Sequence, residues 1–390
     1  MFSAQDARWM ARAIALARRG CYTTSPNPAV GCVIVKHDRL LGEDMLLGEG
    51  CHRQAGGPHA EVFALRQAGA RAEGATAYVT LEPCAHTGRT PPCAKALIDA
   101  KVARVVVACV DANPQVAGKG LAMLEAAGIM AQAGLMAEEA QTLNTGFMHR
   151  MRTGLPYVTL KLAASLDGRT ALANGQSKWI TGPHARRDVQ RHRALSCAIL
   201  SGADTVIMDN ASLNVRWSEL PASVASDYGE PEGFGSSTAP TLRQPLRVII
   251  DTRNRLTPSL KLFSLPGPIL LLRSHASGDF NEQVEECVLP LAPDGKLDLS
   301  ALMQELGRRQ INHLWVEAGA QLAGALLGQQ LVHELILYQA PKLMGNSARG
   351  LFNLAPLTDM SQVIDLEWQD VRFIGNDLKL SAHIRYHIEP

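Results

Sequence analysis

The first part of the chain alternates between helical and extended apolar patterns. Residues 5–19 carry apolar side chains three and four positions apart and stop at Gly20, which is typical of an amphipathic helix. Strands that alternate with helices favour an α/β layer sandwich. The patterns predict strands at 29–35, 40–47, 75–81 and 104–110, and helices at 59–68, after Pro91-Pro92, within 111–128 and at 137–148.

A second α/β pattern follows a short polar connection at 150–156, so we expect a domain boundary near residue 150 and two domains, 1–150 and 151–390. Residues 217–245 are rich in Ser, Pro and Gly and have no period, which predicts a mobile loop or a tolerated surface insertion rather than a lid. The second half predicts extended segments at 157–164, 198–201, 205–208, 246–251, 268–272, 313–317 and 334–338, and helices from Pro183, at 299–309 and at 321–327.

Composition agrees with two globular domains. A chain of 390 residues is too long for one ordinary core, and 46% apolar with 19% charged residues is the composition of a soluble globular protein. The net charge of +1 gives no large basic surface for a polyanion, so we expect neither nucleic acid nor an anionic membrane as the main partner. No apolar run is long enough to span a membrane.

The eight cysteines are spread along the chain and are not arranged as a secreted disulfide framework. The N-terminus lacks the basic-then-apolar order of a signal peptide, so we expect a cytoplasmic protein. Six cysteines are interpreted as small buried structural residues: Cys21, Cys32, Cys51, Cys109, Cys197 and Cys287.

The remaining two cysteines belong to the main chemical motif of the chain. His59 and Glu61 stand at a predicted helix start, Cys84 follows a predicted strand, and Cys93 follows two prolines. One imidazole and two thiolates are ligands that zinc takes, and three protein ligands leave the fourth tetrahedral position for water. A His-x-Glu followed by a Pro-Cys…Cys pair is the signature of zinc deaminases.

The spacing between the two cysteines departs from the simple signature. That signature has Cys-x2-Cys, whereas eight residues separate Cys84 from Cys93. The intervening stretch holds His86, which is a possible substitute ligand or substrate contact. A structural zinc module closed by His86, beside a degenerate second domain, is therefore one rival hypothesis. A nucleobase deaminase acting on RNA is another, although the low charge and 5% aromatic content speak against it.

The N-terminal motifs resemble one family. SPNPAVGCVIV, HAE, TLEPCAHTGRTPPCAKALI and VDANPQVAGKG are together similar to the deaminase half of the bifunctional riboflavin-biosynthesis deaminase–reductases, including the long Cys…Cys spacing. The resemblance implies a cytidine-deaminase-like fold and a ribosylated diaminopyrimidinone 5′-phosphate as substrate. It implies His59, Cys84 and Cys93 as zinc ligands, Glu61 as proton shuttle, Asn27 and Asp111 as pocket residues, and Arg89 and Lys119 as candidate phosphate partners.

This chemistry suits those residue types. Zinc lowers the pKa of its bound water toward neutrality, and the resulting hydroxide attacks an electron-poor, amidine-like carbon. Glu61 takes the proton of the water and passes one to the departing amine.

The second half contains a weaker motif, WVEAGAQLAGALL. Glu317 ends a predicted strand, Gly319 permits a tight turn, and a helix follows, so backbone N–H groups and a helix dipole could face a phosphate. The full dinucleotide glycine fingerprint is absent. From the residues alone, a strand–turn–helix without a ligand is the simpler interpretation.

The second half resembles the reductase half of the same family, a dihydrofolate-reductase-like fold that uses NADPH. The similarity rests on KLAASLDGRT, SKWITGPHARRDVQ, ADTVIMDNASLNVR and VEAGAQLAGALL. It implies that the substrate contacts Lys161, Ser177, Arg193, Leu213, Arg216 and Glu317, and that the cofactor contacts Ala163, Trp179, Thr205, Asp209, Gly319, Ala320, Gln321, Leu322, Ala323, Gly324 and Ala325. Arginine forks suit a phosphate, and Lys161 is a candidate proton donor.

Two departures from the family pattern are visible. Asp209-Asn210-Ala211 stands where Asp-Asp-Pro is usual, and Ala318-Gly319 stands where Gly-Gly is usual. We expect neither to abolish activity. The resemblance predicts a bifunctional enzyme that deaminates the pyrimidine and then reduces the ribosyl group to a ribityl chain. The expected partners are this phosphorylated small molecule and further copies of the chain, as a dimer or tetramer.

Overall fold

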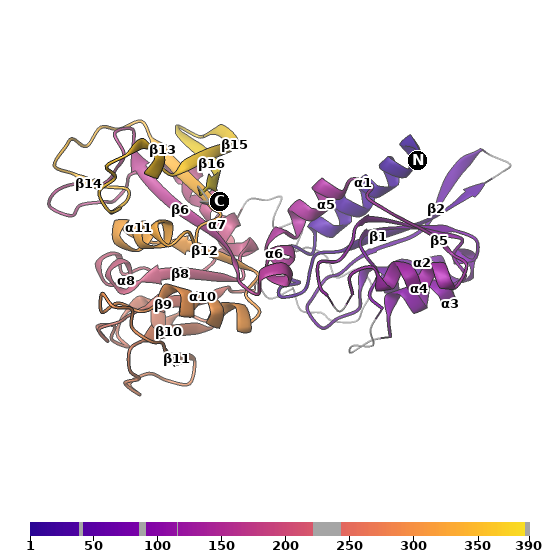
Figure 1. Cartoon of the computed structure of the whole chain (residues 1–390), viewed down its shortest axis with the longest axis horizontal. Helices are drawn as coiled ribbons and strands as arrows, with labels where there is room; N and C mark the ends of the chain where they lie inside the picture. The colour runs from indigo at the N-terminus through magenta and orange to yellow at the C-terminus, as the bar shows by residue number, and fades with distance from the viewer. Residues whose placement is uncertain (39–41, 86–90, 115, 221–242, 387–390) are drawn as a thin grey trace. The chain divides into compact units, whose positions relative to one another are not determined.

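The structure of the chain is a computed structural model that describes residues 1–38, 42–85, 91–114, 116–220 and 243–386. The chain divides into two compact units, Met1–Gly154 and a second unit that begins at Leu155 (Figure 1). Most of the predicted 217–245 loop lies outside the described residues. None of the helices in the described ranges is both long and apolar enough to cross a membrane.

The first unit is built on a five-stranded sheet of order β2-β1-β3-β4-β5. The β1 strand is antiparallel to both of its neighbours, whereas β3, β4 and β5 run parallel. The strands are β1 (Gly31–Asp38), β2 (Glu43–Cys51), β3 (Thr76–Leu81), β4 (Arg104–Cys109) and β5 (Met130–Ala133).

Helices cover both faces of this sheet, as the α/β/α prediction requires (Figure 1). Alternate residues of β1 illustrate the division: Val33 packs with the α1 side and Ile34 with the α2 side. One face carries α1 (Ala4–Arg18), α5 (Ala137–Leu143) and α6 (Thr145–Thr153), and the other carries α2 (Ala60–Ala68), α3 (Cys93–Asp99) and α4 (Lys119–Ala126), with the short 3₁₀ turn η1 (Gly69–Ala72) after α2.

The second unit is built on a nine-stranded sheet of order β11-β10-β9-β8-β12-β6-β13-β16-β15. Every pair from β11 to β13 is parallel, and β16 and β15 add an antiparallel edge. The strands are β6 (Tyr157–Ser165), β8 (Ala198–Gly202), β9 (Leu246–Ile250), β10 (Ile269–Arg273), β11 (Val284–Val288), β12 (His313–Glu317), β13 (Glu334–Ala340), β15 (Asp365–Ile374) and β16 (Asp377–Arg385), with a separate pair β7 (Arg169–Ala171) and β14 (Arg349–Gly350).

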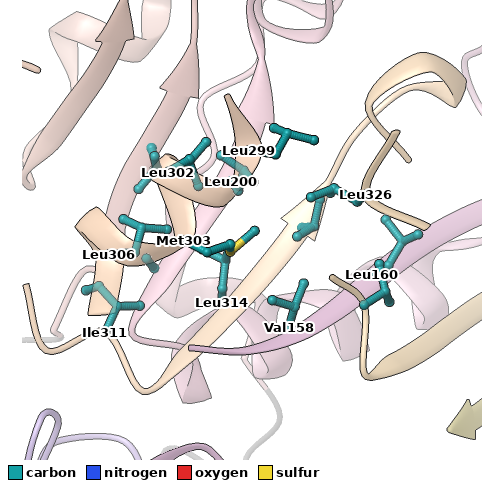
Figure 2. Close-up of a cluster of buried hydrophobic side chains, with 14 of the residues drawn as sticks. Val158, Leu160, Leu200, Leu299, Leu302, Met303, Leu306, Ile311, Leu314 and Leu326 are labelled. Atoms are coloured by element: carbon teal, nitrogen blue, oxygen red, sulfur yellow. The ribbon is translucent and has the colours of Figure 1, made fainter. Parts of the chain in front are cut away.

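The core on one face of this sheet joins α10 (Leu299–Arg308) and α11 (Ala320–Gly328) to the central strands. Figure 2 shows Leu302, Met303 and Leu306 of α10 directed at Leu200 and Leu314 of the sheet. The other face packs against α7 (Pro183–Leu195), α8 (Ala203–Asp209) and the 3₁₀ turn η3 (Lys261–Ser264); η2 (Trp217–Glu219) and η4 (Met360–Gln362) are further single turns.

Several predicted boundaries were wrong. The segment 205–208 belongs to the helix α8, because its apolar residue Val206 packs against a strand from one helical face. The strand predicted at 40–47 is β2, which runs from Glu43 to Cys51. The polar connection expected at 150–156 is mostly the end of α6, whose first turns bury Phe147 and Met148.

The β15–β16 hairpin was not predicted at all. β15 is an edge strand with almost every residue exposed, so it shows no alternation of buried and solvated positions. Periodicity detects a strand only where one face is covered. The strand is instead held by its partner β16, which buries Lys379 and Ala382.

Candidate functional site

Three side chains of the first unit form a donor centre, which we define as His59, Cys84 and Cys93. His59 is the N-cap of α2, Cys84 lies just beyond β3, and Cys93 is the first residue of α3. Their ligand atoms all lie within 4.8 Å of one another, which makes this the one cluster with metal-ligand character in the described part of the chain. Two helix starts and the segment after one strand therefore bring these three side chains together.

The distances in the donor centre fit a zinc ion. His59 Nδ1 lies 3.2 Å from Cys93 Sγ and 3.7 Å from Cys84 Sγ. Zinc–sulfur bonds of about 2.3 Å and zinc–nitrogen bonds of about 2.0–2.1 Å in a tetrahedron put neighbouring donors about 3.5 Å apart. The nitrogen and two sulfurs thus fit three corners of a zinc tetrahedron. His86, the alternative ligand, lies outside the described residues, as does Arg89.

The thiols of Cys84 and Cys93 are joined by a hydrogen bond. The hydrogen bond from Cys93 lowers the pKa of Cys84, and the same bond raises the pKa of Cys93. The Cys93 backbone N–H also donates to Cys84 Sγ at 3.4 Å. Cys84 is therefore the thiolate that this pocket stabilises most readily before a metal binds.

Glu61 lies in the first turn of α2, two residues after His59 of the donor centre. Its side chain is buried, and its Oε2 has no hydrogen-bond partner among the described residues. Burial raises the pKa of Glu61, against the opposing charge of a protonated His59. A buried oxygen without a partner is costly, so its persistence beside a donor centre indicates a missing polar neighbour such as water or substrate.

Glu82 has the opposite surroundings. Its carboxylate accepts hydrogen bonds at 2.9–3.2 Å from the backbone N–H groups of Asp111, Gly118, Gly120 and Leu121. It thereby ties the loop that carries the predicted pocket residue Asp111 to the strand end that carries Cys84. Glu82 stands in the stretch TLEPC, but nothing in that stretch predicts this bracing role.

The predicted substrate residue Asn27 is held by a residue that sequence inspection missed. His52 Nδ1 donates to the Pro58 carbonyl at 2.9 Å, so its Nε2 accepts from Asn27 Nδ2 at 3.2 Å. His52 is also buried edge-on against His59, with 5.4 Å between ring centroids. The Asn27 amide is therefore oriented with its oxygen available. The other phosphate candidate, Lys119, begins α4 and is exposed.

The second unit contains a cavity of about 1680 Å³, larger than the few hundred Å³ of many small-molecule pockets. It opens beyond the carboxyl ends of parallel strands, where ligands of α/β sheets bind. No side chain caps α11, whose N-cap Gly319 faces the cavity. The predicted residues that line it are Lys161, Ala163, Ser177, Thr205, Asp209, Glu317, Gly319, Ala320, Gln321, Leu322 and Ala325.

Glu317 and Lys161 form the polar centre of this cavity, in direct register on β12 and β6. Arg193 grips Glu317 with two hydrogen bonds of 2.6 and 2.8 Å. Burial raises the pKa of Glu317, but the charge and hydrogen bonds of Arg193, the charge of Lys161 and the Trp315 hydrogen bond together outweigh it and lower the pKa to about 2. Burial also lowers the pKa of Lys161, while the Glu317 charge works against this.

The remaining predicted reductase residues do not line the described cavity. Arg193 uses Nε and Nη2 on Glu317 and Nη1 on the Asn214 carbonyl, so its fork is internally paired rather than open to a phosphate. Arg216 pairs with Glu219 at 2.8 Å. Trp179 is exposed, and the Arg186 guanidinium lies over its ring. Leu213 and Ala323 are buried in the core. The Cα of Gly324 packs against the backbone of Asn353.

A buried polar network lies behind the cavity. Asp188 accepts from Lys379 at 2.8 Å and from Tyr338 at 2.6 Å, and Lys379 approaches His192 Nε2 at 2.7 Å. His192 stacks on Trp315, whose indole N–H donates to Glu317 at 2.9 Å. The network thus connects α7 and β16 to the Glu317 end of the cavity. No local sequence signal identifies it, since its members are up to 191 positions apart.

Comparisons with known proteins cover almost the whole chain. Residues 156–380 match the family model of the RibD C-terminal domain, and residues 3–109 match the cytidine and deoxycytidylate deaminase zinc-binding region. The riboflavin biosynthesis protein RibD of Haemophilus influenzae is 52% identical over 385 residues, covering 97% of this chain and 98% of that protein. The Escherichia coli RibD is 53% identical over 377 residues, covering 96% and 98%.

Solved structures also resemble almost the whole chain. Acinetobacter baumannii RibD, form 1, has a TM-score of 0.86 and 46% identity, covering 98% of this chain and 99% of that one. The Thermotoga maritima diaminohydroxyphosphoribosylaminopyrimidine deaminase/5-amino-6-(5-phosphoribosylamino)uracil reductase has a TM-score of 0.81 and 29% identity, covering 97% and 98%. Both the cytidine-deaminase-like and the reductase halves of the predicted fold are confirmed.

Proposed function

Because this chain belongs to the RibD family of bifunctional riboflavin biosynthesis proteins, we propose that its two reactions are carried out at the donor centre with Glu61 and at the cavity around Lys161 and Glu317. The enzyme is a zinc-dependent pyrimidine deaminase and an NADPH-dependent reductase. The division near residue 150 into domains 1–150 and 151–390 assigns one reaction to each. The compact units, which divide after Gly154, support that assignment.

In the deamination, Glu61 moves the protons. The donor centre would hold the zinc, which would supply an acidified water. The unpartnered Glu61 Oε2 is the observation that carries this assignment, since it is a buried acceptor two residues from the ligand His59. Glu61 accepts the proton of the attacking water and delivers one to the amine that leaves the substrate's carbon 2. Ammonia and the uracil-type ring are the products.

The pyrimidine is oriented by Asn27 and Asp111. The bond from Asn27 Nδ2 to His52 leaves the Asn27 oxygen to accept from a substrate N–H or hydroxyl. Asp111 is held by its backbone N–H to Glu82 and accepts from the Asn113 N–H. Both side chains are thus fixed before the substrate arrives, which reduces the entropy lost on binding.

In the reduction, the cavity residues would hold the ribosyl carbon beside NADPH, which would supply the hydride. Lys161 is the proton donor to the ring oxygen that leaves when the ribose opens. Its lowered pKa and its place beside Glu317 suit a lysine that gives up its proton more readily than an ordinary lysine does. Arg193 acts as a positioning residue that keeps Glu317 ionised and fixed, rather than as a phosphate ligand.

The decisive experiment follows product mass with the diaminopyrimidinone ribotide, with and without NADPH. Glu61→Gln keeps the shape of the side chain but removes the proton acceptor, so deamination should fall by about 10²–10⁴-fold. Zinc content and reduction of supplied deaminated intermediate should stay at wild-type values. Glu73→Gln, an exposed glutamate of the same unit, is the matched control.

Two outcomes would contradict this division of labour. One is a folded, zinc-loaded Glu61→Gln protein that still deaminates at the wild-type rate. The other is a loss of both reactions together in the folded variant, because the reductase cavity contains no part of α2.

We further propose that the enzyme is a homodimer that associates through the β15 face, defined as Leu366, Trp368, Val371 and Phe373. These four side chains share one face, because their partners on β16 alternate in register, and they are 39–76% exposed. An uncovered apolar edge strand is a pairing surface. A two-fold antiparallel pairing that sets Trp368 of one copy against Val371 of the other also sets Glu367 against Arg372. Apolar side chains then face apolar side chains, and opposite charges face each other.

Light scattering after gel filtration tests the dimer. Trp368→Lys should convert a dimer into a monomer of 42.0 kDa, and Leu357→Lys, an exposed apolar residue outside β15, should not. A Trp368→Lys protein with the wild-type mass would contradict the proposal.

A cytoplasmic location is supported by the eight cysteines, all in the described residues, none of which forms a disulfide.

A further inference from the structure

The cavity of the second unit extends across the ends of four neighbouring strands of the sheet. Its lining residues include Lys161 on β6, Glu317 at the end of β12, Gly202 at the end of β8 and Thr252 just beyond β9. These four parallel strands are consecutive neighbours in the order β9-β8-β12-β6. Three strand spacings of about 4.8 Å make the cavity about 14 Å wide across the strands. An elongated ligand can therefore lie across all four strand ends.

The proposed function sets the direction of the cofactor in this cavity, and the present inference rests on it. If the reduced ribosyl carbon lies beside Lys161 and Glu317, the nicotinamide must lie at the β6–β12 end. The adenosine half of the dinucleotide then extends over β8 toward β9. The residues after β9 accordingly face the adenosine ribose.

Cationic side chains line the β9 end of the cavity, and they differ in whether a carboxylate pairs with them. Arg255 pairs with Asp204 at 2.6 Å, and Lys296 pairs with Asp294 at 2.9 Å. Arg253 also lines the cavity, yet no hydrogen-bond acceptor or carboxylate of the described residues pairs with its side chain. Arg253 therefore supplies an uncompensated charge and an open guanidinium fork.

We propose that Arg253 recognises the 2′-phosphate on the adenosine ribose of NADPH and so sets the preference for NADPH over NADH. A guanidinium binds a phosphate through two parallel N–H bonds, which a ribose hydroxyl cannot reproduce. Arginine beside the adenosine ribose is a general way for dinucleotide sites to accept this phosphate. Arg255 and Lys296 are already neutralised by their own carboxylates, Asp204 and Asp294.

The test compares Arg253→Ala with the wild type by two methods. Equilibrium calorimetry measures binding of 2′,5′-ADP and of 5′-AMP, which differ in the 2′-phosphate and carry no hydride. Steady-state kinetics measures kcat/KM with NADPH and with NADH. We expect the affinity for 2′,5′-ADP and the kcat/KM for NADPH to fall about 10–100-fold, through KM, because a charge-assisted pair is lost. The values for 5′-AMP and NADH should change less than about twofold.

Two controls make the result specific. Arg308→Ala removes another exposed arginine of this unit, on α10 and outside the cavity, and should alter neither ratio. Arg253→Lys retains the charge without the fork and should give intermediate values.

The inference is overturned if Arg253→Ala keeps the wild-type ratio of 2′,5′-ADP to 5′-AMP affinity, or if it weakens both ligands equally. That outcome differs from a failure of the proposed reductase function, in which the wild type itself would neither bind 2′,5′-ADP nor oxidise NADPH.

Discussion

Glu61 and Glu82 are two buried glutamates of the first unit whose surroundings give them different tasks. Glu82 is saturated by four backbone N–H groups, whereas Glu61 retains an oxygen without a partner among the described residues. A carboxylate that accepts several amides is fixed in place, and one with an open oxygen can exchange protons. The hydrogen-bond partners, rather than burial alone, separate the structural acid Glu82 from the proposed catalytic acid Glu61.

Replacing Glu82 by Gln tests the structural role. The amide NH₂ would face backbone donors, so at least two hydrogen bonds are lost and the free energy of unfolding of this unit should fall by about 2–4 kcal/mol. Thermal unfolding should show a lower midpoint, and deamination should weaken because the Asp111 loop loses its anchor. Reduction should be unchanged. A Glu82→Gln protein that melts and deaminates like the wild type would refute the bracing role.

His192 makes the stability of the second unit depend on pH. Burial lowers its pKa to about 4, and the neighbouring Lys379 favours the neutral ring while Asp188 opposes it. The unfolded ring binds a proton near pH 6.5, so between these values the unfolded state holds more protons. The contribution of the neutral His192 ring to the free energy of unfolding is fully present above about pH 6.5 and is lost as the pH falls toward 4.

We therefore expect the unfolding midpoint of the second unit to drop by several degrees between pH 7 and pH 5. His313, which is buried and has its pKa lowered to about 4 as well, adds to the same trend. His192→Gln should flatten this slope, since the replacement does not titrate. An identical slope in calorimetric scans of the variant would show that His192 does not contribute.

At the scale of elements, Gly31 of β1 allows α1 to pack closely against the strand. A Cβ on Gly31 would lie 1.9 Å from the carbonyl oxygen of Ala13, so the helix backbone directly contacts the strand. The helix itself is well specified by local residues, with Ser3 and Asp6 forming a capping box. The close packing of α1 on the sheet depends on the absence of a side chain at Gly31.

Gly31→Ala should consequently destabilise the first unit by about 2–4 kcal/mol, because backbone cannot move aside as a flexible side chain can. Chemical denaturation followed by circular dichroism measures the change. Gly328→Ala, at the end of α11 with open space around it, should be neutral or slightly stabilising. Equal stability of Gly31→Ala and wild type would mean that α1 can shift without cost.

The elements differed in how well they could be predicted. Helices with a capped start and one apolar face, such as α1 and α10, follow from local spacing. The β15 strand escaped prediction because it has no buried face, and the 205–208 segment was misread because four apolar or β-branched residues suit a strand as well as a helix. Short segments take their conformation from neighbours rather than from their own propensity.

At the scale of the molecule, the two units should respond separately to ligands. Zinc at the donor centre binds the folded first unit far better than the unfolded chain, so its removal should lower the unfolding midpoint of that unit only. Calorimetry with and without a zinc chelator measures this, and added zinc should restore the midpoint. Cys84→Ser, which lacks one ligand, should be insensitive to the chelator. A chelator effect on both transitions would show that the units are not thermodynamically independent.

The sequence by itself determined the ligand types, their placement at helix starts and the two α/β patterns, because caps, prolines and apolar periods act over a few residues. Only the tertiary structure decided which of those residues meet. The grip of Arg193 on Glu317, the orientation of Asn27 by His52 and the position of Arg253 at the cavity's far end join residues that are distant in the chain. Such pairings depend on strand order and register, which the packing of each whole unit sets.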